Sequence, residues 1–266
     1  MDNTRYVPEK KLKHLFYKIA ARLTYSIEFL FPPEKLHYKD IPIIINNYNR
    51  VTTLKKLIAA LEKRGYYNIF IIDNNSTYDP LLEYYKNECR HKVFRLDVNI
   101  GTLALWQSGI FKKFKNNFFV YTDSDIVPVE DCPDDFMLFF FNILQKYKLA
   151  QKVGFSLKID DIPDHNLMKA SILKHEGQFY QYFNDKDNIY RAPIGATFAL
   201  YRPRGRYRHA NFHIQIFRTG YPYMAYHLPW YQDSLSPDEE EKYYIEHSGP
   251  RTWYTSASKK YLVKPV

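Results

Sequence analysis

The chain has little glycine and little cysteine. Of its 266 residues, nine are glycine, and the two cysteines are Cys89 and Cys132. Neither G-x-G-x-x-G nor G-x-x-x-x-G-K-[ST] occurs, so the sequence gives no support to a Rossmann oxidoreductase or a P-loop NTPase. Two cysteines form no disulfide framework and fit a reducing compartment.

Long apolar runs are also missing. The longest, Phe136 to Leu144, is interrupted by Asn142 and is far shorter than the roughly 20 residues that span a bilayer. The start of the chain shows no apolar signal-peptide region. We therefore expect a cytoplasmic protein, with any membrane contact limited to the inner face of a membrane.

Positive charge and aromatic side chains are abundant instead. The formal net charge is +9, and 18% of the residues are aromatic, including 25 tyrosines. Such a charge favours anionic partners, namely nucleotides, phospholipid head groups or nucleic acid. No recognised nucleic-acid-binding motif accompanies it, so we predict no nucleic-acid partner.

Residues 10–31 are predicted to form an amphipathic helix that ends at Pro32-Pro33. Its apolar residues recur at steps of three and four: Leu12, Leu15, Phe16, Ile19, Leu23, Ile27 and Leu30. Its other faces carry Lys11, Lys13, Lys18 and Arg22. The helix either lies on an anionic membrane or packs on its own domain or a neighbouring subunit. We treat residues 1–36 as this segment and residues 37–266 as one domain.

Strand and helix patterns alternate along residues 40–130, the predicted nucleotide-binding half. Apolar runs predict strands at 41–46, 68–72, 92–96 and 118–122. Helices are predicted at 52–61 (capped by Thr52 or Thr53), 80–88 and 99–114. This order indicates an α/β domain with a doubly wound, mostly parallel sheet.

Residues 131–266, the predicted acceptor-side half, are less regular. We expect a helix at 135–148, strands at 152–159 and 194–201, and loops over 160–190. The run Glu239–Glu241 is predicted to be the solvated first turn of a further helix.

Two carboxylates, Asp123 and Asp125, follow the apolar run Phe118–Thr122. A strand delivers them to its carboxyl end, where open α/β sheets bind ligands. Hard oxygen donors at such a point suit Mg²⁺ or Mn²⁺, which can hold a diphosphate. The other Asp-x-Asp, Asp185-Lys-Asp187, has no strand before it and is predicted to be a turn.

The order of these strand ends resembles that of family-2-like glycosyltransferases of the GT-A fold, well over residues 41–130 and loosely elsewhere. The segments that carry the resemblance are Ile43–Arg50, Ile71–Ser76, Asn99-Ile-Gly101 with Gly109-Ile110, and Thr122–Asp125. Where the family has an Arg-Asn pair before its Gly-Ile, this chain has Trp106 and Gln107. The resemblance implies a Rossmann-like single domain and transfer from a nucleotide sugar.

The resemblance also implies a donor-binding set. Asp73 is suited to accept a hydrogen bond from a nucleobase N–H, Tyr48 to contact the base, and Arg50 to reach a phosphate. Asp73 is equally suited to capping the turn that follows it. The predicted nucleotide-binding residues are Tyr48, Arg50, Asp73, Asn75, Asn99, Gly101, Ser124 and Gly195.

The predicted metal ligands are Asp123, Asp125 and His227. A catalytic base must remove the proton of the acceptor hydroxyl. Asp233 is the first candidate, and Asp161, with its neighbour Asp160, is the second. Trp230 and Tyr231 are candidates for an acceptor platform. Alternating arginines are predicted to form a cationic strip or a solvated loop: Arg202, Arg204, Arg206 and Arg208.

The predicted activity is metal-dependent transfer of a hexose-type sugar from a nucleoside diphosphate to a hydroxyl of a glycan or lipid-linked acceptor, with inversion. The alternatives are a sugar-phosphate nucleotidyltransferase and a non-catalytic or nucleic-acid-binding domain of similar fold. The Gly-free turn Asn46–Arg50 argues against the nucleotidyltransferase, whose first strand is followed by a Gly-rich loop.

Overall fold

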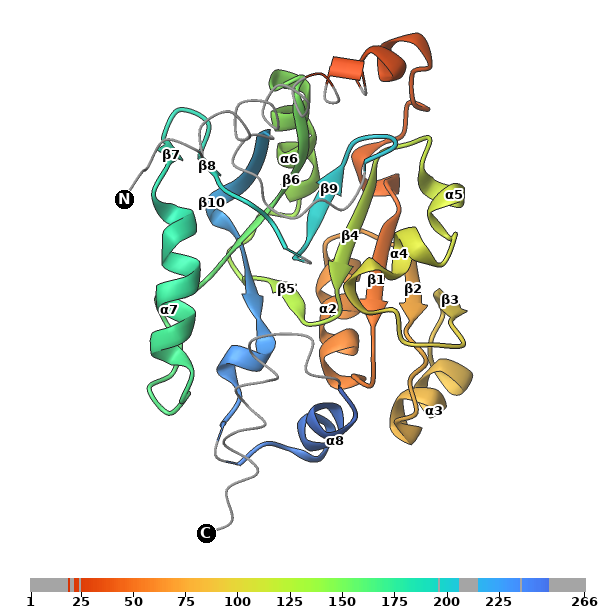
Figure 1. Cartoon of the computed structure of the whole chain (residues 1–266), viewed down its shortest axis with the longest axis vertical. Coiled ribbons are helices and arrows are strands. Elements are labelled where there is room, and N and C mark those ends of the chain that lie inside the picture. The colour runs from red at the N-terminus through yellow and green to blue at the C-terminus, as the bar shows by residue number, and fades with distance from the viewer. Residues whose placement is uncertain are drawn as a thin grey trace, which may run out of the picture.

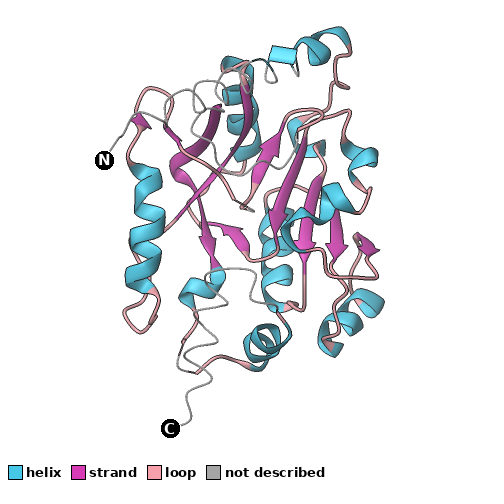
Figure 2. Cartoon of the chain, viewed as in Figure 1, coloured by secondary structure: helices cyan, strands magenta, loops and turns pink. Residues whose placement is uncertain are grey.

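One ten-stranded sheet organises the chain in the computed structural model, in the order β3-β2-β1-β4-β9-β6-β10-β8-β7, with β5 paired to β10 (Figures 1 and 2). The structure describes residues 19, 22–23, 25–195, 197–205, 215–234 and 236–248. The strands are β1 (Ile43–Asn47), β2 (Ile69–Asp73), β3 (Lys92–Arg95), β4 (Phe119–Asp123), β5 (Ile126–Pro128), β6 (Ala150–Leu157), β7 (Phe183–Asn184), β8 (Ile189–Arg191), β9 (Ala199–Tyr201) and β10 (Gln215–His227).

The α-helices are α2 (Thr52–Lys63), α3 (Asp79–Asn87), α4 (Ala104–Gln107), α5 (Phe111–Phe114), α6 (Phe136–Lys146), α7 (Lys169–Gly177) and α8 (Glu239–His247). Short 3-10 turns occur at η1 (Tyr38–Asp40), η2 (Gly101–Leu103), η3 (Gln178–Tyr180) and η4 (Leu228–Tyr231). No helix in the described ranges is long and apolar enough to cross a membrane.

Strands β1 to β4, from residues 40–130, form the parallel part of the sheet. Strand β1 pairs with β2 and β4, and β2 pairs with β3. Their arrows all point toward α8 in Figure 1, so their carboxyl ends share one edge. Helices α2 and α6 pack on one face through residues such as Leu57 and Phe140. The other face is covered by α4 and α5 through Leu105 and Phe114. This two-sided burial explains why the strands are continuously apolar and confirms the expected α/β class.

The structure differs from the sequence expectation in four places, three in residues 131–266 and one, the predicted helix 99–114, in residues 40–130. Strand β9 is shorter than the predicted 194–201 and runs antiparallel between β4 and β6. The longest strand, β10, was not predicted. Helix α7 lies within the segment expected to be loops. The predicted helix 99–114 is broken into η2, α4 and α5, with Gly109 at φ +79° between the last two.

The predicted N-terminal helix is only partly within the described residues. Residues 25–30 are helical and are anchored by Glu28, which is 9% exposed. Both Glu28 carboxylate oxygens accept from Arg202 Nη1, at 2.9 and 3.0 Å. Arg202 is 1% exposed and also donates to the carbonyls of Ala150 and Leu144. Arg202 is therefore a core residue and not part of an exposed cationic strip.

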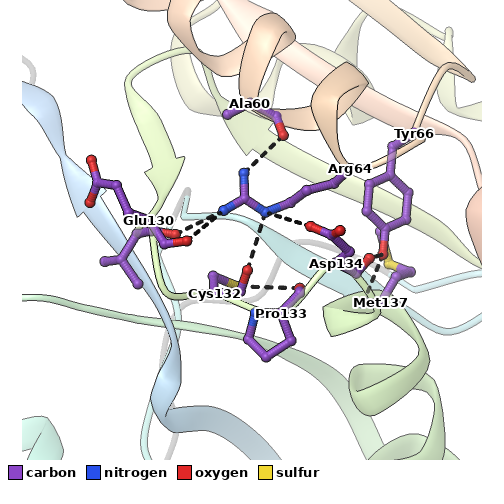
Figure 3. A network of polar contacts seen from close by, with 9 residues as sticks. Ala60, Arg64, Tyr66, Glu130, Cys132, Pro133, Asp134 and Met137 are labelled. Carbon is purple, nitrogen blue, oxygen red and sulfur yellow. Dashed lines mark hydrogen bonds and ion pairs between the residues drawn. The ribbon is translucent and has the colours of Figure 1, made fainter.

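Arg64, just after α2, fixes the chain that leaves β5 (Figure 3). Its guanidinium is buried and donates to the carbonyls of Val129 at 3.0 Å, Glu130 at 3.3 Å and Cys132 at 3.3 Å. These carbonyls belong to the loop between β5 and α6 and have no regular strand partner to satisfy them. Arg64 thus holds in place the segment that follows the Asp123–Asp125 turn.

Candidate active site

A cavity of about 270 Å³ opens at the carboxyl edge of β1, β2 and β4. Seven predicted site residues line it: Tyr48, Arg50, Asn99, Gly101, Asp123, Ser124 and Asp125. Lining residues that the sequence analysis did not assign to the site include Asn46, Asn74, Gln107, Tyr244 and Ser248. The strand order therefore brings together side chains from the four segments that follow β1 to β4, as the strand-end pattern predicted, and α8 with Ser248 adds a fifth segment.

The paired carboxylates lie where β4 gives way to β5. Asp123 Oδ1 accepts from Asn46 Nδ2 at 3.1 Å, and the Asp125 carbonyl accepts from Leu228 N–H at 2.9 Å. Burial, followed by the charge of Asp125, raises the pKa of Asp123 above its ordinary value. Asp125 Oδ1 is buried without a hydrogen-bond partner. A buried carboxylate oxygen without a donor is what a cation would satisfy.

His227, at the end of β10, lies beside Asp125, with Nε2 3.6 Å from Asp125 Oδ2. Burial lowers its pKa, against the opposing effect of Asp125, so the imidazole is neutral at pH 7. In the described ranges no three His, Cys, Asp or Glu side chains form a ready metal cluster. Asp123 and Asp125 line the same cavity, and His227 lies next to Asp125 but outside the cavity lining.

Arg50 is held between two residues of α8. Its Nη1 is 2.6 Å from Glu241 Oε2, both side chains being 5% exposed or less, and its Cζ lies 3.9 Å from the centre of the Tyr244 ring. Burial opposes its charge, but Glu241, Tyr244 and Asp125 outweigh that effect and raise its pKa. Arg50 is thus a permanent cation at the wall of the cavity.

Helix α8 is joined to the strand edge at three further points. Glu240 Oε2 accepts from the N–H groups of Val51 and Thr52, both at 2.9 Å, and so caps α2 in place of the predicted Thr52 or Thr53. Tyr48 Oη donates to the His247 carbonyl at 3.0 Å, and Tyr243 Oη to the Thr77 carbonyl at 3.1 Å. The expectation that Glu240 and Glu241 are solvated is therefore wrong; both are buried.

Asp73 and Asn75 take different positions after β2. Asp73 is fully buried; its Oδ2 accepts from Ser76 N–H and Arg95 Nε, both at 3.2 Å, while its Oδ1 has no partner. It therefore caps the following turn, as one of the two sequence interpretations had it. Asn75 is exposed at φ 63°, and its neighbour Asn74 lines the cavity instead.

The remaining candidates lie outside the lining of this cavity. Gly195 is exposed, with open space where a side chain would stand. Asp233 is exposed after η4. Asp161 accepts from Tyr231 Oη at 2.7 Å and pairs with Lys158 at 3.0 Å. Trp230 is 4% exposed, so it packs in the core and offers no acceptor platform.

Two further arginines, Arg204 of the predicted strip and Arg218, lie within the described residues. Arg218 is buried and pairs with Glu176 at 2.6 Å. Arg204 lies in a turn at φ 62°. Arg206 and Arg208 fall outside the described residues. The second Asp-x-Asp, at Asp185–Asp187, is a turn, as predicted, but the short strand β7 precedes it, where no strand was expected.

The chain is thus an α/β domain whose parallel half carries paired carboxylates and a cavity at its carboxyl edge. Residues 43–140 match the family model described as glycosyl transferase family 2. The match confirms the resemblance to glycosyltransferases of this family over that segment, which contains Asp123 and Asp125. A search of curated proteins found no match.

Solved structures with a similar backbone include S. aureus TarS 1-349, at 14% identity and a TM-score of 0.42, covering 70% of this chain and 59% of that one. GalNAc-T7 with UDP, GalNAc and Mn²⁺ has 14% identity and a TM-score of 0.41, covering 82% and 53%. A cytidylyltransferase from Leptospira borgpetersenii has 12% identity and a TM-score of 0.35, covering 61% and 60%. The chain thus spans little more than half of these proteins.

Proposed function

We propose that this protein transfers a sugar from a nucleoside diphosphate sugar to a hydroxyl of a glycan or lipid-linked acceptor, with inversion at the anomeric carbon. The observation that carries the proposal is that Asp123, Asp125 and Arg50 line the same cavity, at the strand edge of a family 2 segment. We further propose residues 37–266 as the transferase domain and residues 1–36 as an appended segment.

Asp123 and Asp125, with His227 beside them, are the residues that would hold Mn²⁺ or Mg²⁺. A divalent ion there supplies charge stabilisation to a departing diphosphate. Arg50 adds a fixed cation in the lining of the same cavity, and its planar donor fork suits a phosphate. Tyr48, Asn99, Gly101 and Ser124 would surround the nucleotide, and Asp73 would support the base side of the cavity.

Asp233 is the proposed base that removes the acceptor proton. It is exposed, and it follows the η4 turn that begins next to His227. Asp161 is the second candidate, and its carboxylate accepts from Tyr231 and pairs with Lys158. Asp233→Asn is expected to lower kcat with little effect on donor affinity, while Asp161→Asn retains most activity. The reverse result would exchange the two roles.

The exposed apolar residues near the N-terminus support peripheral contact with an anionic membrane. Leu23, Phe29, Leu30 and Phe31 are 57%, 76%, 67% and 65% exposed, although Glu28 between them is buried. The sequence around them carries Lys11, Lys13, Lys18 and Arg22. Apolar side chains flanked by cations suit the interface of an anionic bilayer. A lipid-linked acceptor would be within reach of such a protein.

The test is a thermal-shift screen of UDP, GDP, CMP and dTDP, each with and without Mn²⁺. A ligand of the folded state raises Tm by mass action. We expect one diphosphate to raise Tm only with Mn²⁺, and Asp125→Ala to abolish the shift. Asp185→Ala, in the Asp-x-Asp of the β7–β8 turn, is the matched control and should behave as wild type.

If the nucleoside diphosphate with Mn²⁺ stabilised both Asp123→Ala and Asp125→Ala as fully as wild type, the proposal would be wrong. Turnover distinguishes the rival enzyme class, because a glycosyltransferase releases a nucleoside diphosphate whereas a nucleotidyltransferase releases pyrophosphate from a nucleoside triphosphate.

A further inference from the structure

A chain of buried amides connects the Asp123 carboxylate with the loop on the far side of the cavity. Ile100 N–H donates to Asn74 Oδ1 at 3.2 Å. Asn74 Nδ2 donates to Asn46 Oδ1 at 2.5 Å, and Asn46 Nδ2 donates to Asp123 Oδ1 at 3.1 Å. Asn74 is 1% exposed and Asn46 is 8% exposed. Three strand ends and the loop of Asn99 and Gly101 are therefore joined by one hydrogen-bonded path.

The direction of this path is fixed by its two ends. The Ile100 N–H can only donate, so Asn74 must present its oxygen there and its NH₂ group elsewhere. That NH₂ group also donates to the Gly101 carbonyl at 3.3 Å, which can only accept. Asn46 must then accept from Asn74 and donate to Asp123. Rotating either side-chain amide by 180° would exchange its oxygen and its NH₂ group. Two donors or two acceptors would then face each other in the protein interior, which is unfavourable.

The consequence for Asp123 is a fixed orientation. Asn46 takes one carboxylate oxygen, which stabilises the charged form and leaves the other oxygen for a further ligand. Partners of this kind, one step beyond a metal ligand, typically change metal affinity by about 10- to 100-fold when they are removed. Asn74 touches no carboxylate itself, so its influence on Asp123 can pass only through Asn46.

We propose that Asn46 and Asn74 are positioning residues that orient Asp123 for a divalent cation and tie the cation site to the Asn99–Gly101 side of the cavity. This role rests on the proposed function. The ion is Mn²⁺ or Mg²⁺, and the two asparagines act on it solely through the Asp123 carboxylate. It follows that a change at Asn74 alters cation affinity without removing any cation ligand.

The sharpest variant is Asn74→Asp, which keeps the shape and the acceptor for Ile100 but loses the donor. Asn46 must then turn its NH₂ group toward position 74 and its oxygen toward Asp123, which pushes the Asp123 carboxylate away. We therefore expect Mn²⁺ affinity at pH 8 to fall about tenfold. If the new carboxylate acted only by attracting the cation, Mn²⁺ would bind more tightly. A lower Mn²⁺ affinity therefore indicates lost orientation of Asp123, and a higher one indicates simple attraction.

Mn²⁺ affinity is measured without nucleotide, from the electron paramagnetic resonance signal of free Mn²⁺, on protein whose folding is checked by circular dichroism. Asn74→Ala serves as a second variant that removes the whole amide, and Asn87→Asp, exposed at the end of α3, adds the same charge outside the path. The Asn46→Ala/Asn74→Ala double variant should bind Mn²⁺ about as weakly as Asn46→Ala alone, because both break one chain.

Wild-type protein that binds no Mn²⁺, either alone or with the nucleoside diphosphate of the thermal-shift screen, overturns the proposed function and this role with it. If Mn²⁺ binds only with that diphosphate, the variants are compared in its presence. Wild-type protein that binds Mn²⁺ while the folded Asn74→Ala and Asn74→Asp variants bind it equally well overturns the positioning role alone. Losses at Asn46 and Asn74 that simply add in the double variant also overturn it.

Discussion

Arg202 and Glu28 form a buried ion pair between residues 174 positions apart, with one guanidinium nitrogen bonded to both carboxylate oxygens. Removing one partner of such a pair leaves a charge without compensation in the interior. Arg202→Met is therefore expected to lower the free energy of unfolding by about 3 to 5 kcal/mol, measured by urea denaturation. Glu28→Met should cost less, because Arg202 keeps its carbonyl partners.

Lys55 and Glu88 form the matched control, since their side chains are 43% and 61% exposed at a separation of 2.7 Å. Lys55→Met should cost less than about 1 kcal/mol. Equal losses for Arg202→Met and Lys55→Met would show that Arg202 does not anchor the N-terminal segment.

The hydrogen bonds of Arg64 predict that stability depends on the shape of its guanidinium group and not only on its charge. Arg64→Met removes the side-chain donor to the Glu130 and Cys132 carbonyls of the β5–α6 loop, whereas the Val129 carbonyl keeps the Cys132 N–H. The substitution should lower the free energy of unfolding by about 3 kcal/mol. Arg64→Lys should recover only part of this, because a compact ammonium cannot reach several carbonyls in one plane. Complete recovery by lysine, in the same denaturation experiment, would contradict the assigned hydrogen bonds.

Arg50 predicts selectivity for the phosphates of a nucleotide. Arg50→Met should weaken binding of the active nucleoside diphosphate by about tenfold, the loss of one charge-assisted contact, while the parent nucleoside binds as before. Isothermal titration of both ligands gives the comparison within one variant. Equal losses for diphosphate and nucleoside would mean that Arg50 only supports the cavity wall with Glu241 and Tyr244.

Asp123 predicts a pH dependence with a definite sign. Its pKa is raised in the folded protein, so the native state holds the proton more tightly than the unfolded chain does. The stability that this carboxyl contributes is complete below the unfolded value near 4 and is lost as pH rises toward the folded value. In EDTA, the Tm of Asp123→Asn relative to wild type should therefore increase from pH 5 to pH 8. A constant difference across that range would refute the shift.

The exposed apolar residues after Glu28 predict binding to vesicles. Wild-type protein should sediment with vesicles containing phosphatidylglycerol and not with phosphatidylcholine alone, and salt should weaken the binding. Phe29→Ser/Phe31→Ser should abolish sedimentation, whereas Val98→Ser, at a site that is 62% exposed, should not. Concentration-dependent dimerisation that the same double substitution removes would identify a second copy of the chain as the partner instead.

The sequence predicted the parallel half well because its signals are local. Continuous apolar runs that stop at polar clusters define β1, β2 and β4, and parallel strands necessarily bring those clusters to one edge. Asp123, Asp125 and Arg50 were predicted in this way, and they line one cavity. Asn46 and Asn74 sit in the same clusters, so the signal for them was present, but their hydrogen-bond path depends on distances that no spacing rule supplies.

The second half was harder because its contacts are long-range. Strand β10 carries Tyr, Arg and Pro among its apolar residues and shows no clean alternation, so it was missed. From the sequence, Glu240 and Glu241 are typical of the charged first turn of a helix. Nothing near them in the sequence indicates that Glu240 binds the start of α2 or that Glu241 pairs with Arg50. Their burial is decided by residues nearly two hundred positions earlier.

The attachment of α8 to the strand edge has a consequence for synthesis of the chain. The segment that matches the family model ends at residue 140, and a ribosome will have completed it long before α8 appears. Until then α2 lacks its Glu240 cap, Arg50 lacks Glu241, and the cavity lacks the wall formed by Tyr244. A nascent chain therefore contains β1 to β5 first, β6 to β10 next and α8 last, so premature termination before α8 yields all the strands without the α8 wall of the cavity.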